Sequence, residues 1–303
     1  MGKHFHLYEN ISKVDPFEGS QHYLAPAWAF HLQALFMGFV FFAGTPLNLL
    51  VLLATAKYKK LRAPLNYILV NISFAGFIFV TFSVSQVFVA SLRGYYFLGY
   101  TLWLMMTMTM TFFLQPSSSA APTPPPPWSS PGSWGWAAYI PEGLGCSCGP
   151  DWYTHNEEYG CTSYMYFLLI TCFCMPLSII IFSYSQLLGA LRAVAAQQAE
   201  SASTQKAEKE VSRMIIVMVG SFVTCYGPYA LTGLWYANSE EVNKDYRLVT
   251  IPAFFSKSSC VYNPLIYAFM NKQFNACIME MVFGKKMEEA SEVSSKTEVS
   301  TAS

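Results

Sequence analysis

The sequence predicts an all-α membrane protein built as a bundle of spanning helices. Hydrophobic residues make up 53% of its 303 residues and charged residues only 12%, well below the roughly 25% charged residues of soluble domains. Several uncharged stretches exceed the roughly 18 residues that mark a transmembrane helix. Basic residues gather beside the ends of these stretches, where they set the orientation of a helix. The formal net charge is zero, so we expect no nucleic-acid partner.

The first two spanning helices fix the orientation of the chain. We expect them within residues 28–92, one at 28–54 and one at 66–92. A basic cluster lies between them: Lys57, Lys59, Lys60 and Arg62. Since basic residues favour the cytoplasmic side, residues 1–27 are predicted to be extracellular. Asn10 opens an Asn-Ile-Ser triplet in that segment and is a candidate glycosylation site.

Residues 93–138 interrupt the pattern. Residues 95–114 are long enough to span, but Met and Thr alternate there with a period nearer to two than to 3.6. Seven prolines between Pro116 and Pro131 then exclude a helix. If residues 95–114 crossed the membrane without a return helix, the later basic loops would lie on the extracellular side, against the preference of basic residues for the cytoplasm. We therefore expect a non-spanning, re-entrant or interfacial stretch and no fourth helix. The abrupt change in composition is typical of a shifted reading frame or a retained intron.

The rest of the chain divides into four parts: an extracellular loop at 139–162, spanning helices within 163–270, an amphipathic membrane-surface helix at 271–286 and a Ser/Thr-rich cytoplasmic tail at 287–303. The expected helices are at residues 163–188, 214–236 and 248–270, with a charged cytoplasmic connection at 192–213.

The last of these helices carries a lysine at membrane depth, Lys257. An ammonium there costs on the order of 2.5–3.5 kcal/mol, so it must be paired, neutralised or used. A Schiff base with a buried aldehyde satisfies this requirement, because its nitrogen can stay unprotonated or pair with a carboxylate. A lysine in a water-filled pore, or one paired with a stray acid, is the alternative.

Six residues after the lysine the chain reads Asn263-Pro264-Leu265-Ile266-Tyr267. The proline frees a backbone carbonyl, which Asn263 or a water could satisfy, and so predicts a hinge. Lys257 with this motif resembles the seventh helix of vertebrate visual opsins, closest to short-wavelength (ultraviolet or violet) cone pigments. The resemblance spans about residues 1–99 and 139–303. It implies an opsin-like bundle, that of a rhodopsin-type G protein-coupled receptor, with helix 3 aberrant and helix 4 absent.

The resemblance implies a chromophore, 11-cis-retinal, attached as a Schiff base to Lys257. Tyr226 would lie against its polyene, and Glu142 would be a carboxylate near the Schiff base. The family's helix 3 glutamate is replaced by Met106, which would favour a neutral, ultraviolet-absorbing form. Phe79 matches a position where phenylalanine accompanies ultraviolet tuning. Without the family context it is an apolar core residue.

The resemblance also implies a switch that carries the light signal to the cytoplasmic side. Helix six would move about Pro228, and Tyr184 and Tyr267 would rearrange near the inner surface. Asn263 and Pro264 complete this set.

Partners follow from the same resemblance. Glu210 and Arg213, at the inner end of helix six, would face a heterotrimeric G protein of the transducin type. The tail would be a target of a receptor kinase and of arrestin, or a merely solvating segment. Its candidate phosphorylation sites are Ser291, Ser294, Ser295, Thr297, Ser300 and Thr301. The implied location is the membrane of the cone outer segment.

Some family features are missing from the sequence. The loop cysteine matching Cys148 usually pairs with a cysteine of helix 3, but Trp103 stands there. The acidic-Arg-Tyr motif has no counterpart in the sequence. Cys146, Cys148 and Cys161 make an odd number on the outer side, which leaves a Cys148–Cys161 pair open. None of the cysteines has metal-ligand spacing.

Two functions remain open. The first is a light-sensing receptor, which is not an enzyme. The second is a truncated, opsin-derived membrane protein that binds no chromophore and does not signal. A pore or transporter around Lys257 lacks a paired acid and an internal repeat. An enzyme that forms a lysine Schiff base lacks a nearby acid–base constellation.

Overall fold

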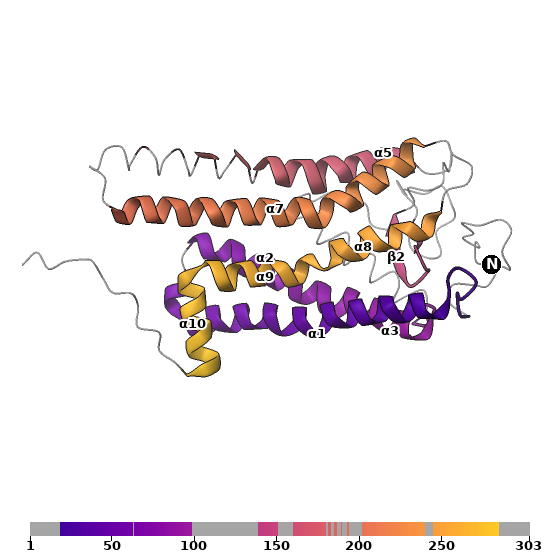
Figure 1. The fold of residues 1–303 in the computed structure, drawn as a ribbon, viewed down its shortest axis with the longest axis horizontal. Coiled ribbons are helices and arrows are strands. Elements are labelled where there is room, and N and C mark those ends of the chain that lie inside the picture. Colours follow the sequence, from indigo (N-terminus) through magenta and orange to yellow (C-terminus); the bar gives the residue numbers. More distant parts are fainter. Residues whose placement is uncertain are drawn as a thin grey trace, which may run out of the picture.

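The computed structural model describes residues 19–62, 64–98, 139–150, 160–179, 202–239 and 245–284, with isolated residues between 181 and 193. Long helices run side by side in an elongated bundle, with a two-stranded hairpin at one end and a short helix across the other (Figure 1). The predicted stretch at residues 95–114 falls almost wholly outside the described residues.

The first two passes form one antiparallel pair. α1 (Ala27–Lys57) is followed by a short 3-10 turn, η1 (Lys59–Leu61), and by the second pass. That pass consists of α2 (Pro64–Phe79), a π-helical segment η2 (Val80–Val84) and α3 (Ser85–Arg93), joined without a break in helical backbone. It ends at Gly94, whose φ of 75° is the left-handed conformation that commonly closes a helix.

The third and fourth described passes lie against each other. α5 (Cys161–Leu168) continues through a π-helical segment, η3 (Leu169–Cys174), and on to Ile179. α7 (Ala202–Asn238) packs beside it and bends within its second half, which contains Pro228 (Figure 1).

α7 begins earlier than the sequence predicts. The expected connection at 192–213 is wrong from Ala202 onward, because Ala202–Arg213 is already helical. This stretch is rich in Ala, Gln, Lys and Glu, which are strong helix formers, and Lys206 and Glu210 have the i, i+4 spacing that supports a solvated helix. Hydropathy detects the apolar part of a helix and misses such a polar extension.

The lysine-bearing pass is divided into two helices. After a 3-10 turn, η4 (Tyr246–Val249), α8 (Thr250–Lys257) ends at the lysine and α9 (Ser259–Met270) begins two residues later. Between them the N–H of Ser258 is shared among the carbonyls of α8, including those of Phe254 and Phe255 at 3.2 Å each. The predicted weak point was Pro264, but α9 runs through that proline and the interruption lies beside Lys257.

A helix-to-helix hydrogen bond explains why α9 tolerates its proline. Pro264 has no N–H, so the carbonyl of Cys260, four residues earlier, loses its helical partner. The side-chain amide of Asn48 in α1 donates to this carbonyl at 2.8 Å and also to the carbonyl of Gly44 at 2.8 Å. The predicted partner, Asn263 or a water, is therefore replaced by Asn48.

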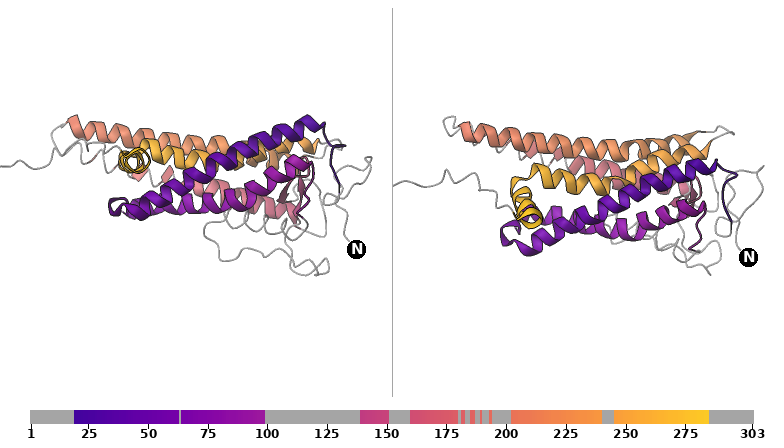
Figure 2. Two further views of the ribbon diagram at one scale, coloured as in Figure 1. Left: turned by 90° about the horizontal axis from the view of Figure 1, so that it is seen from below. Right: turned by 60° about the horizontal axis from the view of Figure 1, so that its bottom comes forward.

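The two ends of the bundle, which we call inner and outer after the orientation predicted from the sequence, differ in their polar contacts. At the inner end, Arg62 donates to the carbonyls of Thr55 and Ala56 and so caps α1. At the outer end, Arg247 pairs with Asp245 at 2.7 Å and donates to the carbonyl of Leu24 at 3.0 Å. In both views of Figure 2 the start of α1 and the end of α3 meet at this outer end.

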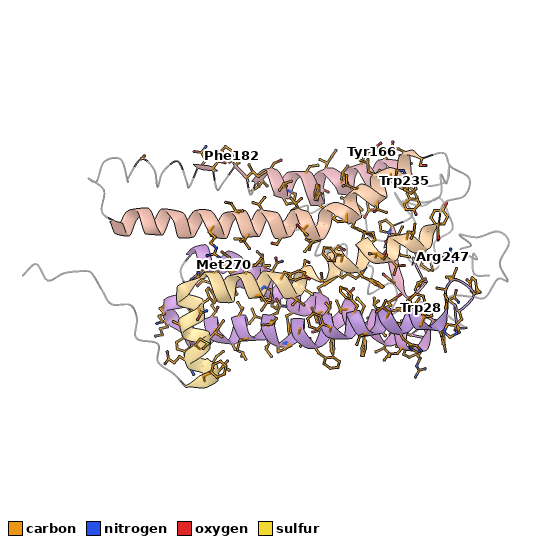
Figure 3. All side chains as sticks on the ribbon, viewed as in Figure 1. Trp28, Tyr166, Phe182, Trp235, Arg247 and Met270 are labelled. Carbon is orange, nitrogen blue, oxygen red and sulfur yellow. The ribbon has the colours of Figure 1, made fainter. Side chains whose placement is uncertain are left out.

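Aromatic side chains gather at the outer end of the bundle. Trp28, Tyr166 and Trp235 come from the start of α1, the start of α5 and the end of α7, and all three lie at the same end of the bundle (Figure 3). Each is exposed. Such a belt of amphipathic rings is typical of the level of the lipid headgroups.

Four helices among the described residues are long and apolar enough to cross a membrane: Ala27–Lys57, Leu69–Arg93, Cys161–Ile179 and Ile216–Asn238. α8 and α9 together form a further pass, which is split at Ser258. The chain continues into α10 (Lys272–Phe283), which covers most of the predicted surface helix.

Candidate functional site

The centre of the candidate site is a pair of opposite charges. The amine Nζ of Lys257, at the end of α8, lies 3.8 Å from the carboxylate oxygen Oε2 of Glu142. Their side chains are only 3% and 1% exposed. Removing two charges from water is costly, and their attraction offsets this cost when further hydrogen bonds complete the pair.

The remaining contacts of Glu142 fix the orientation of its carboxylate. Tyr229 of α7 donates its phenol hydroxyl to Oε1 at 2.7 Å. Ser147 donates its hydroxyl to Oε2 at 3.5 Å. Glu142 therefore joins three parts of the chain, namely the hairpin, α7 and the lysine helix.

Glu142 reaches this place on a hairpin. Strands β1 (Tyr139–Glu142) and β2 (Ser147–Pro150) pair antiparallel, with Glu142 opposite Ser147. The turn between them contains two glycines at positive φ, Gly143 at 61° and Gly145 at 75°, where other residues would be strained. The hairpin is inserted into the outer end of the bundle, because residues 142–147 are all buried.

The turn is pressed directly against the first residue of α8. A Cβ atom on Gly143 would lie 2.0 Å from the hydroxyl oxygen of Thr250. The contact between the turn and the lysine helix therefore has no room for a side chain, and it sets the depth of Glu142 relative to Lys257.

The thiol of Cys146, in the same turn, is also buried. Its sulfur lies 3.7 Å from the carbonyl of Ala90 at the outer end of α3. Burial raises the pKa of the Cys146 thiol to about 12, and a hydrogen bond with Ser91 partly opposes this shift. This thiol is a packing group that stays protonated at neutral pH.

Aromatic residues extend from the lysine toward α5. The ring of Phe254 lies 5.5 Å from Nζ of Lys257. The phenol of Tyr226 and the hydroxyl of Ser259, two residues after the lysine, are 2.8 Å apart. Tyr226 contacts the ring of Phe222 at 5.0 Å, and Phe222 stacks on Phe173 of η3 at 5.7 Å.

The structure brings several predicted residues to this site and places others elsewhere. Glu142 and Tyr226 lie beside the lysine helix, as described above. Phe79 packs on the apolar cluster that contains Phe254 and Cys260, the neighbours of Lys257. Among the residues predicted to form the switch, Asn263 is half-buried, Pro264 is buried and Pro228 is exposed. Arg213, predicted to face the G protein, is exposed in the inner part of α7.

Other predicted residues lie outside the described part of the chain. These are Asn10, Trp103, Met106 and the tail residues Ser291, Ser294, Ser295, Thr297, Ser300 and Thr301. The side chains of Cys148, Tyr184, Glu210 and Tyr267 also lie outside it.

Sequence reasoning missed Tyr229 and Ser147. A signal existed for Tyr229, since it follows Tyr226 by three residues and so shares its face of the helix. Ser147 follows from the register of a short hairpin once Glu142 is chosen. A polar side chain at membrane depth such as Asn48 predicts a helix-to-helix hydrogen bond, which the structure confirms. Its acceptor on Cys260 could not be predicted, because a single sequence does not show which helix lies beside α1.

Known proteins resemble this chain along its whole length. Residues 131–267 match the family described as 7 transmembrane receptor (rhodopsin family). The chain is 70% identical to a putative violet-sensitive opsin of Oryzias latipes over 334 positions, which cover 100% of both proteins. It is 64% identical to opsin-1, short-wave-sensitive 1, of Danio rerio, over 97% of both. It is 55% identical to short-wave-sensitive opsin 1 of Bos taurus, over 99% of this chain and 95% of the other.

The fold has a solved counterpart. The crystal structure of squid rhodopsin matches with a TM-score of 0.65 at 20% identity, covering 86% of this chain and 87% of the other. The alignment with the Oryzias latipes protein is longer than this chain, since it has 334 positions against 303 residues, which leaves 31 positions without a residue here.

Proposed function

Because this chain belongs to the vertebrate visual opsins of the short-wavelength group, within the rhodopsin family of membrane receptors, we propose that it binds 11-cis-retinal at Lys257 and signals through a transducin-type G protein. Membership makes it a light-sensing, multi-pass membrane receptor of the G protein-coupled class, and not an enzyme. Retinal is the chromophore that this family uses. The proposal concerns the residues and the partners in this particular chain.

The single observation that carries the proposal is the buried pair of Lys257 and Glu142. An amine held away from water, beside the ring of Phe254, suits attachment of an aldehyde as a Schiff base. Glu142 would provide the negative charge opposite the nitrogen, held in place by Tyr229. Bound retinal would supply absorption of light and a change of shape. Tyr226 would line the polyene, and Phe79 would act at longer range through the apolar cluster.

The contacts around Tyr226 suggest how the change would reach the inner surface. Tyr226 links α7 to α9 through Ser259, and through Phe222 it also contacts η3. Movement of α7 about Pro228 would have to break the link to Ser259. The motif of Asn263, Pro264 and Tyr267, together with Tyr184, would then rearrange nearer the cytoplasm.

The partner proposals rest on the family. The inner end of α7, with Glu210 and Arg213, would face the G protein, and a receptor kinase and arrestin would act on the tail. Asn10 would carry a glycan, and the location would be the cone outer-segment membrane. Cys148 would lack its usual disulfide partner.

A second candidate function is a truncated opsin that does not signal. The 31 alignment positions without a residue favour it, because loss of the expected fourth helix would remove contacts on which the retinal site and the G protein site depend. The two candidates predict different results for the same purified protein.

Addition of 11-cis-retinal to the purified protein tests both. We expect a light-bleachable absorption band that is absent in Lys257→Ala and retained in Lys57→Ala, a control at an exposed lysine of the same chain. Borohydride reduction followed by peptide mapping should place the adduct on Lys257. A band with light-dependent nucleotide exchange on transducin supports the receptor, and a band without exchange means that the chain binds retinal but does not signal. Absence of a band overturns the retinal proposal.

A further inference from the structure

A glycine lies directly beneath the carboxylate of Glu142. A Cβ atom on Gly149 in β2 would lie 2.8 Å from Oε1, 2.9 Å from the carboxyl carbon and 3.2 Å from Oε2 of Glu142. Gly149 and Ser147 are two residues apart in the strand and so share one face of it. The carboxylate therefore lies over this face, bonded to Ser147 and in contact with the bare backbone at Gly149.

The backbone conformation of Gly149 does not itself call for glycine. The described glycines with positive φ are Gly94, Gly143, Gly145 and Gly284, and Gly149 is not among them. Alanine can therefore adopt the same backbone conformation without strain. What glycine provides at this position is space.

The side chain of Glu142 has little freedom to move away from Gly149. Its side chain is 1% exposed, and its two oxygens are engaged by Tyr229 at 2.7 Å and by Lys257 at 3.8 Å. An ideal Cβ contact below 3.0 Å requires one of the two groups to move. Because the carboxylate is the terminal group, it would swing, and its distances to Tyr229 and Lys257 would change together.

We propose that Gly149 is a positioning residue, which reserves the space in which the Glu142 carboxylate faces Lys257. The hairpin thus sets the position of the negative charge in two ways: its turn sets the depth against Thr250, and its second strand leaves room for the carboxylate. The consequence for bound retinal rests on the proposed function, whereas the consequence for the protein without retinal does not.

The first test uses the full chain without retinal. Gly149→Ala should lower the apparent midpoint of thermal unfolding at a fixed scan rate by on the order of 2–6 °C. In a background with Glu142→Ala and Lys257→Ala, which removes both charges together, the same substitution should leave the midpoint nearly unchanged. Gly220→Ala, where an added Cβ meets nothing within 4 Å, is the matched control and should not lower it.

A rescue variant distinguishes the loss of room for the Glu142 carboxylate from general damage to the hairpin. Glu142→Asp, combined with Gly149→Ala, withdraws the carboxylate by one methylene and should recover part of the lost stability. An equal loss in both backgrounds, no loss in the parent chain, or no recovery with Glu142→Asp would overturn the proposal.

The second test uses the retinal-loaded protein. If the parent chain forms a pigment, Gly149→Ala should shift its absorption maximum. It should also shift the pH at which the protonated and unprotonated forms of the Schiff base interconvert. Gly220→Ala should shift neither quantity. An unshifted Gly149→Ala pigment contradicts the positioning role. If the parent chain forms no pigment, the proposed retinal site fails, and the unfolding measurements still decide the role of Gly149.

Discussion

The side-chain amide of Asn48 donates a hydrogen bond to the backbone carbonyl of Cys260 at 2.8 Å, across two helices separated by more than two hundred residues of chain. This carbonyl is the one that Pro264 deprives of its helical N–H. One asparagine in the first pass thus compensates for a proline in the last pass. The relationship leads to the first prediction.

Asn48→Leu should destabilise the protein by about 1–3 kcal/mol, because it leaves the Cys260 carbonyl buried without a partner. The measurement is unfolding in detergent. In a Pro264→Ala background the backbone N–H of residue 264 again bonds the carbonyl, so Asn48→Leu should cost less there. An equal cost in both backgrounds would show that Asn48 matters for another reason.

Tyr226→Phe should cost about 0.5–1.5 kcal/mol, the usual net value of one hydrogen bond, because the ring keeps its contact with Phe222 while the bond to Ser259 is lost. Ser259→Ala should cost a similar amount. The double variant should cost clearly less than the two single costs added together, since each removes the same bond. Strict additivity in this cycle would contradict a direct link between α7 and α9.

Glu142→Leu should be more destabilising than the double variant Glu142→Leu with Lys257→Met. The single change leaves a buried ammonium without its partner, at a cost of about 3–5 kcal/mol, whereas replacing both members of a buried pair by apolar residues is often neutral. Denaturation curves of the three proteins provide the comparison. A double variant as unstable as the single one would mean that the pair is not the main interaction of Lys257.

Cys146 should resist alkylation by N-ethylmaleimide in the folded protein at pH 8, because burial raises the pKa of its thiol to about 12. In the unfolded chain the pKa returns toward 9.0, so mass spectrometry should find Cys146 modified after denaturation. The shift contributes stability that is complete below pH 9 and is lost as the pH rises toward about 12. Rapid labelling of the native protein at pH 8 would contradict the buried position.

The transcript offers a prediction about the origin of the interruption. Reverse-transcribed messenger RNA across codons 100–138 should contain a reading frame that restores the 31 alignment positions without a residue here. The composition of residues 100–138, which is biased first toward Met and Thr and then toward Pro and Ser, motivates this expectation. A transcript that reads through the printed sequence would instead establish the shortened chain as the expressed product.

The sequence predicts the passes of the bundle well because their signal is local. The extents of α1 and of the α2–α3 pass follow from the lengths of their apolar stretches. The lysine site could also be expected, since one ammonium in an apolar helix is conspicuous. Its pairing with Glu142 was reached by resemblance and not by spacing.

Features that depend on neighbouring helices could not be predicted in this way. The choice of acceptor for Asn48 depends on the proximity of α1 to α9. Tyr229 contributes to the site through a hairpin that lies 87 residues away in the chain. Such contacts are set by packing in three dimensions, and one sequence carries no record of them.

The last helix connects the lysine-bearing pass to the first pass at the inner end of the bundle. α10 begins two residues after α9 ends and crosses the inner end of the bundle, with Phe274 and Cys277 packed on Val51 and Ala54 of α1 (Figure 1). A tilt of the lysine-bearing pass relative to α1 would therefore have to shift or break the packing of α10 on α1.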